Sequence, residues 1–346
     1  MSPIIEVKGL TKRYRRHVAV DGIDLEVHEG EIFGILGPNG AGKTTTLEMI
    51  EGLRKPDAGT ITVDGIDAVN DSNRVRNIIG VQLQSTALFP YLTASELIAL
   101  FASFYGVPEP RNRAPELLRL VDLEDKAGSR VDELSGGQQQ RLSIALALVN
   151  TPRVTFLDEP TTGLDPHARR NLWGTILSVR EAGTTVVLTS HYMEEAEFLC
   201  DRIAIMDGGK VIACDTPAGL IRGLDLVATV SATIATANSA PVGEDLRVLP
   251  RGALHDALQQ LPGVVAAEVS PHEAGQRLTL KTKASQVTIV GLLQLASERG
   301  IVLDDLNSSR ATLEDVFLAR TGRTYEEEDP EPEQEAEAPK RGRRAA

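Results

Sequence analysis

The segment Gly37-Pro38-Asn39-Gly40-Ala41-Gly42-Lys43-Thr44 fits the phosphate-binding pattern G-x-x-x-x-G-K-[ST] at every fixed position. The apolar run at residues 32–36 predicts a buried strand before it, and residues 44–50 predict a helix after it, closed by Gly52. The glycines let backbone N–H groups face a polyphosphate, and the helix N-terminus adds positive potential there. We therefore predict a P-loop, in which Lys43 reaches the β- and γ-phosphates of a nucleotide and the Thr44 hydroxyl sits on Mg²⁺.

Composition narrows the partners and the compartment. The 346 residues are enough for two domains, and the formal net charge of −13 argues against nucleic acid as the main partner. Cys200 and Cys214 lack C-x-x-C spacing, which favours a reducing compartment over a disulfide framework or a zinc site. No apolar run approaches the roughly 18 residues that span a bilayer. We expect a soluble chain whose membrane role, if it has one, comes through a partner.

The segments on either side of the P-loop predict short strands. Residues 4–14 and 19–27 alternate apolar with polar side chains and predict antiparallel strands joined by a basic turn. Tyr14 ends the first of them, where its ring could stack on a nucleotide base or be an ordinary edge aromatic. Residues 74–83 lead to Gln84, but Gln82 lies close by, and periodicity does not say which glutamine matters.

A helical region follows. Thr93 opens a capping box, and helical spacing continues to Tyr105. The aromatic residues Phe101, Phe104 and Tyr105 predict either a surface that grips a partner or a small helical core, and both readings stay open. Residues 111–128 predict a second amphipathic helix.

Leu134-Ser135-Gly136-Gly137-Gln138 then runs directly into an apolar-periodic helix. Ser135 can cap this helix, the glycines can bring backbone N–H groups close to a phosphate, and the helix dipole favours an anion at this end. This run and the P-loop, in this order, resemble the ATP-binding cassette (ABC) family, whose signature is LSGGQ.

The resemblance implies roles for further residues. Asp158 and Glu159 end the apolar run 154–157 as in the family's Walker B strand, so Asp158 is expected to hold Mg²⁺ through water and Glu159 to polarise the attacking water. His191, after the strand at residues 185–189, corresponds to the histidine that touches the γ-phosphate. Asp165 is the D-loop aspartate, preceded by Thr-Gly in place of the commoner Ser-Ala.

The same alignment makes Gln84 the Q-loop glutamine and Tyr14 the base-stacking aromatic. The expected catalytic residues are Glu159, His191 and Gln84, and the expected Mg²⁺ ligands are Thr44, Gln84 and Asp158. The expected ATP-binding residues are Tyr14, Gly37, Pro38, Asn39, Gly40, Ala41, Gly42, Lys43, Thr44, Thr45, Ser135, Gly136, Gly137, Gln138 and Asp165.

The implied fold is an α/β P-loop NTPase cassette over residues 1–224, with a parallel core sheet, an antiparallel N-terminal β subdomain and a helical subdomain. Residues 225–322 alternate as β-α-β-β-α-β and predict a small α+β accessory domain, ferredoxin-like in its order. Residues 323–346 combine an acidic block with a basic end and predict a disordered tail. Contact of the basic end with anionic lipid is the alternative reading.

Residues 312–322 and 80–84 also resemble the daunorubicin-type drug-resistance export ATPases. The implied function is a Mg²⁺-dependent ATPase subunit that powers a separate membrane permease, for export of drugs, lipids or other hydrophobic compounds. It implies a position at the cytoplasmic face of the cell membrane and a second copy, or a homologous subunit, as partner. The resemblance places the permease near Gln84 and the helix that follows it.

Two other classes of ABC protein differ from this chain in sequence features. Soluble ABC-type ATPases of translation control carry two cassettes, and those of DNA repair place long coiled coils between P-loop and signature, whereas this chain has one cassette and a domain-sized interval between Lys43 and Ser135. A non-catalytic regulatory cassette is expected to lack Glu159 or His191, and both are present.

Overall fold

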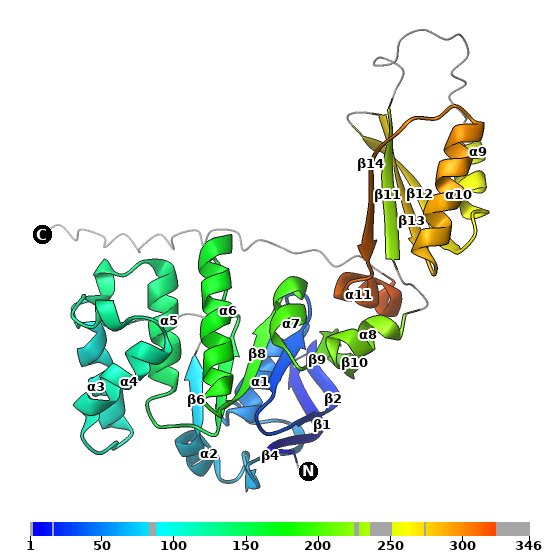
Figure 1. Cartoon of the computed structure of the whole chain (residues 1–346). Helices are drawn as coiled ribbons and strands as arrows, with labels where there is room; N and C mark the ends of the chain where they lie inside the picture. The colour runs from blue at the N-terminus through cyan, green and yellow to red at the C-terminus, as the bar shows by residue number, and fades with distance from the viewer. Residues whose placement is uncertain are drawn as a thin grey trace, which may run out of the picture.

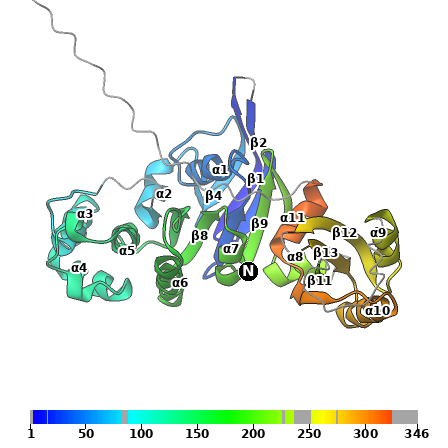
Figure 2. The ribbon, with the colours of Figure 1, turned by 90° about the horizontal axis from the view of Figure 1, so that it is seen from above.

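The protein is represented by a computed structural model, which describes residues 3–15, 17–82, 88–224, 228–235, 251–272 and 275–322. Gln84 and the charged tail lie outside the described residues. The helices between Ala94 and Ala147 lie at one end of the molecule and the C-terminal sheet lies at the other, with the central sheet between them (Figures 1 and 2).

The central sheet carries the P-loop. Its strands are β3 (Ile32–Leu36), β6 (Ile79–Gln82), β7 (Val154–Asp158), β8 (Thr185–Ser190), β9 (Arg202–Asp207) and β10 (Lys210–Asp215). The spatial order is β10-β9-β3-β8-β7-β6; β10 pairs antiparallel with β9, and the remaining pairs are parallel. Every residue of β3, β7 and β8 is buried, as expected for parallel strands covered on both faces. Their carboxyl ends meet at one edge, where open α/β sheets bind ligands.

A second sheet packs against this core. It holds β1 (Ile5–Tyr14), β2 (His17–Val27), β4 (Ala58–Val63) and β5 (Ile66–Asp67) in the order β2-β1-β4-β5, all antiparallel. The two strands predicted before the P-loop are therefore confirmed. Their buried side chains share one apolar cluster with Phe33 of β3 and Met49 of α1 (Lys43–Ile50), so the sheet is joined to the P-loop helix. The short helix α2 (Ser72–Ile78) precedes β6.

The helical layer consists of α3 (Ala94–Phe104), α4 (Pro110–Leu120) and α5 (Gly136–Ala147). Both halves of the predicted capping box at Thr93 are present. The predicted end of the helix over residues 111–128 is wrong. Helix α4 stops at Leu120, and Asp122 then adopts a left-handed φ of 55°. Leu123 is nevertheless buried, so apolar periodicity continues past the true end of the helix.

The aromatic side chains of the α3 region differ in burial, and whether the exposed ones grip a partner stays a prediction. Phe101 packs against the main core, whereas Phe104 and Tyr105 are 68% and 45% exposed. The helix thus buries one face and presents aromatic side chains on another.

The remaining N-terminal elements are α6 (Pro166–Glu181), α7 (Met193–Leu199) and α8 (Pro217–Arg222). The hairpin predicted around Asp207-Gly208-Gly209 is confirmed by the pairing of β9 with β10. Gly208 and Gly209 both have positive φ, 53° and 79°, as the tight turn between two such strands requires.

The C-terminal elements are β11 (Ala228–Ala235), α9 (Arg251–Gln259), β12 (Val264–His272), β13 (Gly275–Thr282), α10 (Ser285–Glu298) and β14 (Leu303–Arg310). Their antiparallel order, β12-β13-β11-β14, is that of a ferredoxin-like sheet, so the β-α-β-β-α-β prediction is confirmed. Leu254, Leu258 and Leu292 pack both helices onto the sheet in a separate apolar cluster.

The last helix, α11 (Leu313–Thr321), belongs to a different cluster. Its fully buried Leu313, Val316 and Phe317 pack into the main N-terminal core beside α7 and α8, as Figure 1 shows for α8. Lys281 of β13 contacts Asp315 at 2.9 Å and ties the C-terminal sheet to this helix. The division of the chain into residues 1–224, 225–322 and 323–346 stays a prediction.

Within the described residues, no helix combines the length and the apolar composition that crossing a bilayer requires.

Candidate functional site

The P-loop follows β3 and leads into α1 through positions that only glycine fits. A Cβ on Gly37 would lie 2.3 Å from the carbonyl oxygen of Met206. A Cβ on Gly42 would lie 2.3 Å from that of Ala19, and Gly42 has a φ of 100°. Both contacts are far below any van der Waals distance, so a larger residue would push the loop away from β9 and β2.

Lys43 is buried inside this loop. Its Nζ donates to the carbonyl oxygens of Gly37 at 2.9 Å and Pro38 at 3.3 Å, and it lies 3.4 Å from Oε1 of Glu159. Burial lowers the pKa of Lys43, and the neighbouring Glu159 carboxylate opposes that effect. The loop therefore holds a cation at the start of α1, where backbone N–H groups also favour an anion.

Glu159 is held between two basic side chains. Its other carboxylate oxygen, Oε2, lies 3.2 Å from Nδ1 of His191 and accepts a hydrogen bond from Thr162 at 3.2 Å. Burial alone would raise the pKa of Glu159, but the hydrogen bond from His191 and the charge of Lys43 lower it to about 2. Glu159 also has a φ of 46°, a strained backbone of the kind that clusters at functional sites.

Asp158 and Thr44 offer oxygen atoms beside this group. The Thr44 hydroxyl donates to Oδ1 of Asp158 at 3.3 Å, and the same oxygen accepts a hydrogen bond from Thr189. Burial raises the pKa of Asp158. A hydroxyl and a carboxylate are hard donors, and Mg²⁺ is commonly bound by one or two carboxylates together with substrate phosphates. These residues therefore fit Mg²⁺.

Thr189 is a functional residue that sequence reasoning missed. Its hydroxyl donates to Asp158 and accepts the backbone N–H of Glu159 at 2.9 Å, so it fixes both acidic residues against β8. The available signal was a hydroxyl near the carboxyl end of an otherwise apolar strand.

Lys43, Thr44 and Glu159 border a pocket of about 320 Å³, a volume suited to a small ligand, whereas Asp158, Thr189 and His191 are not among its lining residues. It brings together most of the P-loop with Glu159 and the end of β1. It also includes His17 and Ala19, which sequence reasoning missed and for which the sequence carries no distinctive signal. The lining residues are Tyr14, His17, Ala19, Asn39, Gly40, Ala41, Gly42, Lys43, Thr44, Thr45 and Glu159.

Tyr14 stands at the rim of this pocket in a basic surrounding. Its ring is 37% exposed, with the Arg54 guanidinium 5.5 Å and the Lys12 ammonium 5.8 Å from the ring centroid. A partly exposed aromatic face beside the P-loop is the geometry that base stacking needs.

The signature residues do not line this pocket. Ser135 caps α5: its Oγ accepts from the Gln138 backbone N–H at 3.3 Å, and the Gln138 side chain accepts from the Ser135 N–H at 2.9 Å. Ser135 and Gly136 are exposed at the start of this 12-residue helix, and Gly137 packs near Ala168 of α6. The structure thus does not bring Ser135, Gly136, Gly137 or Gln138 together with Lys43 of the same chain.

Asp165 likewise lies outside the pocket. It caps α6 by accepting the backbone N–H groups of His167 and Ala168, each at 2.9 Å, and these bonds hold the pKa of Asp165 below its usual range. Its observed contacts are those of a helix cap.

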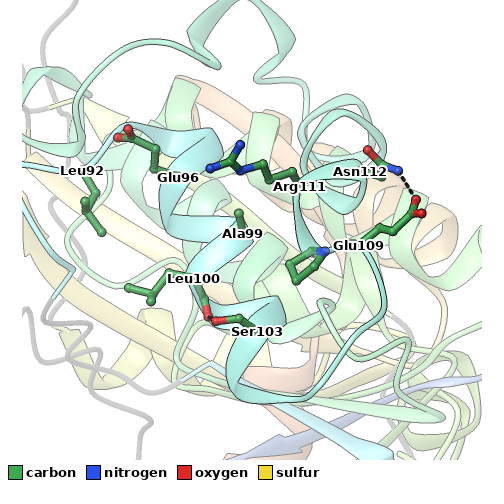
Figure 3. A pocket seen from close by; sticks show the side chains of 9 residues that line it. Leu92, Glu96, Ala99, Leu100, Ser103, Glu109, Arg111 and Asn112 are labelled. Atoms are coloured by element: carbon green, nitrogen blue, oxygen red, sulfur yellow. Dashed lines mark hydrogen bonds between the residues drawn. The ribbon is translucent and has the colours of Figure 1, made fainter.

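A larger hollow of about 670 Å³ lies between α3 and α4 (Figure 3). Leu92, Ala99 and Leu100 give it an apolar side, and charged groups stand around it (Figure 3). Its lining residues are Leu92, Glu96, Ala99, Leu100, Ser103, Glu109, Pro110, Arg111 and Asn112.

Comparison with known proteins identifies close relatives. The sequence pattern of the family described as ABC transporter matches residues 20–162. The Nod factor export ATP-binding protein I of Ralstonia nicotianae is 39% identical over 93% of this chain and 95% of its own. The linearmycin resistance ATP-binding protein LnrL of Bacillus subtilis is 36% identical over 93% of this chain and 99% of its own. The daunorubicin resistance ATP-binding protein DrrA3 of Streptomyces coeruleorubidus is 38% identical over 92% of this chain and 96% of its own.

A solved structure agrees with the fold. The ATP-binding cassette MJ0796, a dimer in a post-hydrolysis state bound to ADP and Pi, is 34% identical, with a TM-score of 0.56 over 61% of this chain and 98% of that one. The expected cassette fold and the resemblance to daunorubicin-type ATPases are confirmed. Since relatives at 36–39% identity match this chain along nearly the whole of both lengths, it belongs to the ABC transporter family, as one of its ATP-binding, ATP-hydrolysing subunits.

Proposed function

We propose that this subunit powers the export of drugs, lipids or other hydrophobic compounds through a separate membrane permease. The observation that carries the proposal is that relatives named for daunorubicin resistance, linearmycin resistance and Nod factor export match the chain over 92–93% of its length. Their similarity therefore extends beyond the ATP-binding segment into the C-terminal sheet.

The site residues divide the work of hydrolysis. Lys43 and the N–H groups of the loop bind the β- and γ-phosphates, and Tyr14 stacks on the base. Glu159 orients the attacking water and accepts its proton, and the His191 imidazole contacts the γ-phosphate. The contacts of Glu159 support this division, because one of its carboxylate oxygens lies 3.4 Å from the Lys43 ammonium and the other lies 3.2 Å from the His191 imidazole.

Thr44 and Asp158 hold Mg²⁺, with Gln84 as the third protein group expected from the sequence. When bound, the ion neutralises charge on the β- and γ-phosphates. Asp158 reaches its position through Thr189, which fixes its carboxylate to β8.

Two subunits work together. Ser135, Gly136, Gly137 and Gln138 stand at a helix N-terminus and outside the pocket of their own chain, and Ser135 and Gly136 are exposed. This placement suits the segment to close over ATP held by another subunit. That subunit is a second copy or a homologue, and the dimeric state of MJ0796 supports the arrangement. Asp165 belongs to the same face in this proposal.

The permease contacts the helical layer at the cytoplasmic face of the cell membrane, where the subunit is peripheral. Phe104 and Tyr105 at the end of α3 are exposed, as are Phe89 and Tyr91 in the segment before the helix, and residues of α3 line the hollow of Figure 3. Exposed aromatic residues near an apolar hollow are typical of protein interfaces. The relatives named above give no support to a soluble role in translation control or DNA repair.

A deletion strain of the source organism tests the proposal. It is complemented with the parent chain, with Glu159→Gln, or with the matched control Glu194→Gln, an exposed carboxylate on α7. Intracellular accumulation of a panel of hydrophobic cytotoxic compounds and lipids is then measured. We expect the parent and control to restore export and Glu159→Gln to fail. A tagged chain that co-purifies with ribosomes or repair proteins, and with no integral membrane protein, would contradict the proposal.

A further inference from the structure

Glu195, in the first turn of α7, is a carboxylate with an exposed fraction of 0%. Its Oε2 accepts a hydrogen bond from the Ser190 hydroxyl at 2.5 Å, and its Oε1 accepts one from the Trp173 indole N–H at 3.2 Å. The Thr161 side chain also hydrogen-bonds to it, and Arg169 is the charged group that acts on it electrostatically. A buried carboxylate costs free energy that an apolar side chain of similar size does not, so packing alone does not account for a glutamate here.

The three donors come from three separate segments. Thr161 lies in the loop that follows Glu159, Ser190 ends β8 immediately before His191, and Trp173 lies on α6. The carboxylate of Glu195 therefore joins the loop that carries the general base to the loop that carries the histidine, and fixes both to a helix.

Ser190 transmits this contact to the histidine. While its hydroxyl donates to Glu195, its oxygen accepts the backbone N–H of Tyr192 at 2.9 Å, which closes the turn around His191. The Tyr192 ring lies 4.1 Å from the imidazole, centroid to centroid, and the Arg169 guanidinium lies 4.0 Å from the Tyr192 ring centroid. His191 therefore lies within a turn that is hydrogen-bonded to Glu195 through Ser190.

We infer that Glu195 is a positioning residue for ATP hydrolysis, which holds the Ser190-His191-Tyr192 turn so that the imidazole stays against Glu159. The inference rests on the proposed role of His191. The hydrogen bonds of Glu195 are to Ser190, Trp173 and Thr161, and not to Lys43 or Glu159, so Glu195 acts through the turn.

Glu195→Gln is the sharpest test because it keeps shape and removes acceptor capacity. An amide offers one accepting oxygen where the carboxylate offers two, so its NH2 group must face a donor. If it faces Ser190, that hydroxyl becomes an acceptor for two N–H groups and its hold on Tyr192 weakens. The matched control is Glu194→Gln, the exposed neighbour on the same helix.

The position of the imidazole is read by NMR of the full chain with labelled histidine. The chain has six histidines, and the His191 signal is assigned by its loss in His191→Ala. We expect the signal to move in Glu195→Gln and to stay in place in Glu194→Gln. An unmoved His191 signal in Glu195→Gln, with kcat as in the parent, overturns the inference.

The ATPase rates of the same variants distinguish a positioning role of Glu195 from a general effect on the stability of the fold. We expect Glu195→Gln to lower kcat roughly tenfold or more with ATP affinity nearly unchanged, as when outer partners of a functional side chain are removed. On a His191→Ala background the same change should lower kcat less than about twofold further, because it acts through the histidine. If Glu195→Gln lowers kcat as much on the His191→Ala background as it does in the parent, Glu195 has a purely structural role.

Three further outcomes complete the test. If Glu195→Gln does not fold, Ser190→Ala replaces it, and a parental kcat with an unmoved His191 signal in that variant overturns the inference. If His191→Ala itself keeps the parental kcat, the proposed role of the histidine fails and the inference fails with it. A loss in His191→Ala together with a parental rate in Glu195→Gln overturns the inference alone.

Discussion

At the scale of single residues, Glu159 links the parts of the site. One carboxylate oxygen lies 3.4 Å from the Lys43 ammonium and the other lies 3.2 Å from His191. A bound phosphate would compete for the same two groups, so the contacts of Glu159 depend on what the P-loop holds. Binding and hydrolysis should therefore be separable by substitution.

Glu159→Gln should bind ATP as the parent does and lose nearly all hydrolysis. The amide preserves the shape of the side chain but cannot accept the proton of the attacking water, a role typically worth roughly 10² to 10⁴ in rate. Single-turnover hydrolysis and equilibrium ATP binding measure the two effects. Turnover near that of the parent would assign the general base to another residue.

The pH dependence of stability should change in the same variant. The pKa of Glu159 falls from 4.5 to about 2 on folding, so its stabilising contribution is complete above pH 4.5 and is lost as pH falls toward 2. In this window one proton corresponds to about 1.4 kcal/mol of unfolding free energy per pH unit. Urea unfolding between pH 5 and 3 should show a shallower loss of stability in Glu159→Gln. An equal slope in both chains would mean that Glu159 is not held as an ion.

Lys43→Ala should weaken ATP binding itself. The ammonium is the main side-chain counterion that the loop offers, and hydrogen bonds to charged groups contribute roughly 1.5–3 kcal/mol. Calorimetry should show the loss, while the melting temperature indicates whether the loop still folds. An affinity equal to that of the parent would refute the P-loop assignment.

The motif residues could be predicted because each follows a strand or precedes a helix in a recognisable local pattern. Thr189 and Glu195 could not. A threonine is common in strands and a glutamate is common on exposed helix faces. Only the burial of these two side chains, and the long-range hydrogen bonds to Asp158 and from Trp173, point to a role. Gln84 lies outside the described residues, and its role stays a prediction.

At the scale of elements, local signals gave helix starts more reliably than helix ends. The capping boxes at Thr93 and Ser135 begin α3 and α5 as expected, because a cap is a contact between residues three apart. The end of α4 depends on the left-handed backbone of Asp122, which no glycine marks. Leu123 continues the apolar period into the core and hides the break.

Helix α3 leads to a prediction about the permease. Phe104→Asp and Tyr105→Asp should impair assembly with the permease, or transport, and leave ATP binding intact, because both side chains are exposed. The buried Leu97 on the same helix is the control: Leu97→Asp should unfold the chain, since it places an unpaired charge in the core. Co-purification from membranes and ATP binding measure the outcomes. Unfolding of Phe104→Asp would favour a purely structural role for the aromatic residues.

At the scale of the whole molecule, the last helix, α11, packs into the core of the N-terminal part. Phe317 and Val316 of α11 are buried among residues of the N-terminal part, although the C-terminal sheet separates them in sequence. Periodicity predicted the helix but could not predict its partner, because that contact spans about a hundred residues of sequence. The ferredoxin-like sheet therefore lies in sequence between two helices, α8 and α11, that contact each other.

The central proposal is that two subunits share each ATP site, and the measurement that tests it most directly is ATP trapping by mixed dimers. A Lys43→Ala chain is mixed with a chain carrying Ser135→Arg and Glu159→Gln. In the mixed dimer one site lacks both the lysine and the serine, while the other combines the intact P-loop of the second chain with the intact signature of the first.

Two helix N-termini closing on one triphosphate should make association depend on ATP. Neither chain alone should trap nucleotide, and the mixture should retain about one ATP per mixed dimer, with Glu159→Gln slowing its loss. A Glu159→Gln homodimer that traps ATP under the same conditions, beside a mixture that traps none, would contradict the proposal that each site is shared between two chains.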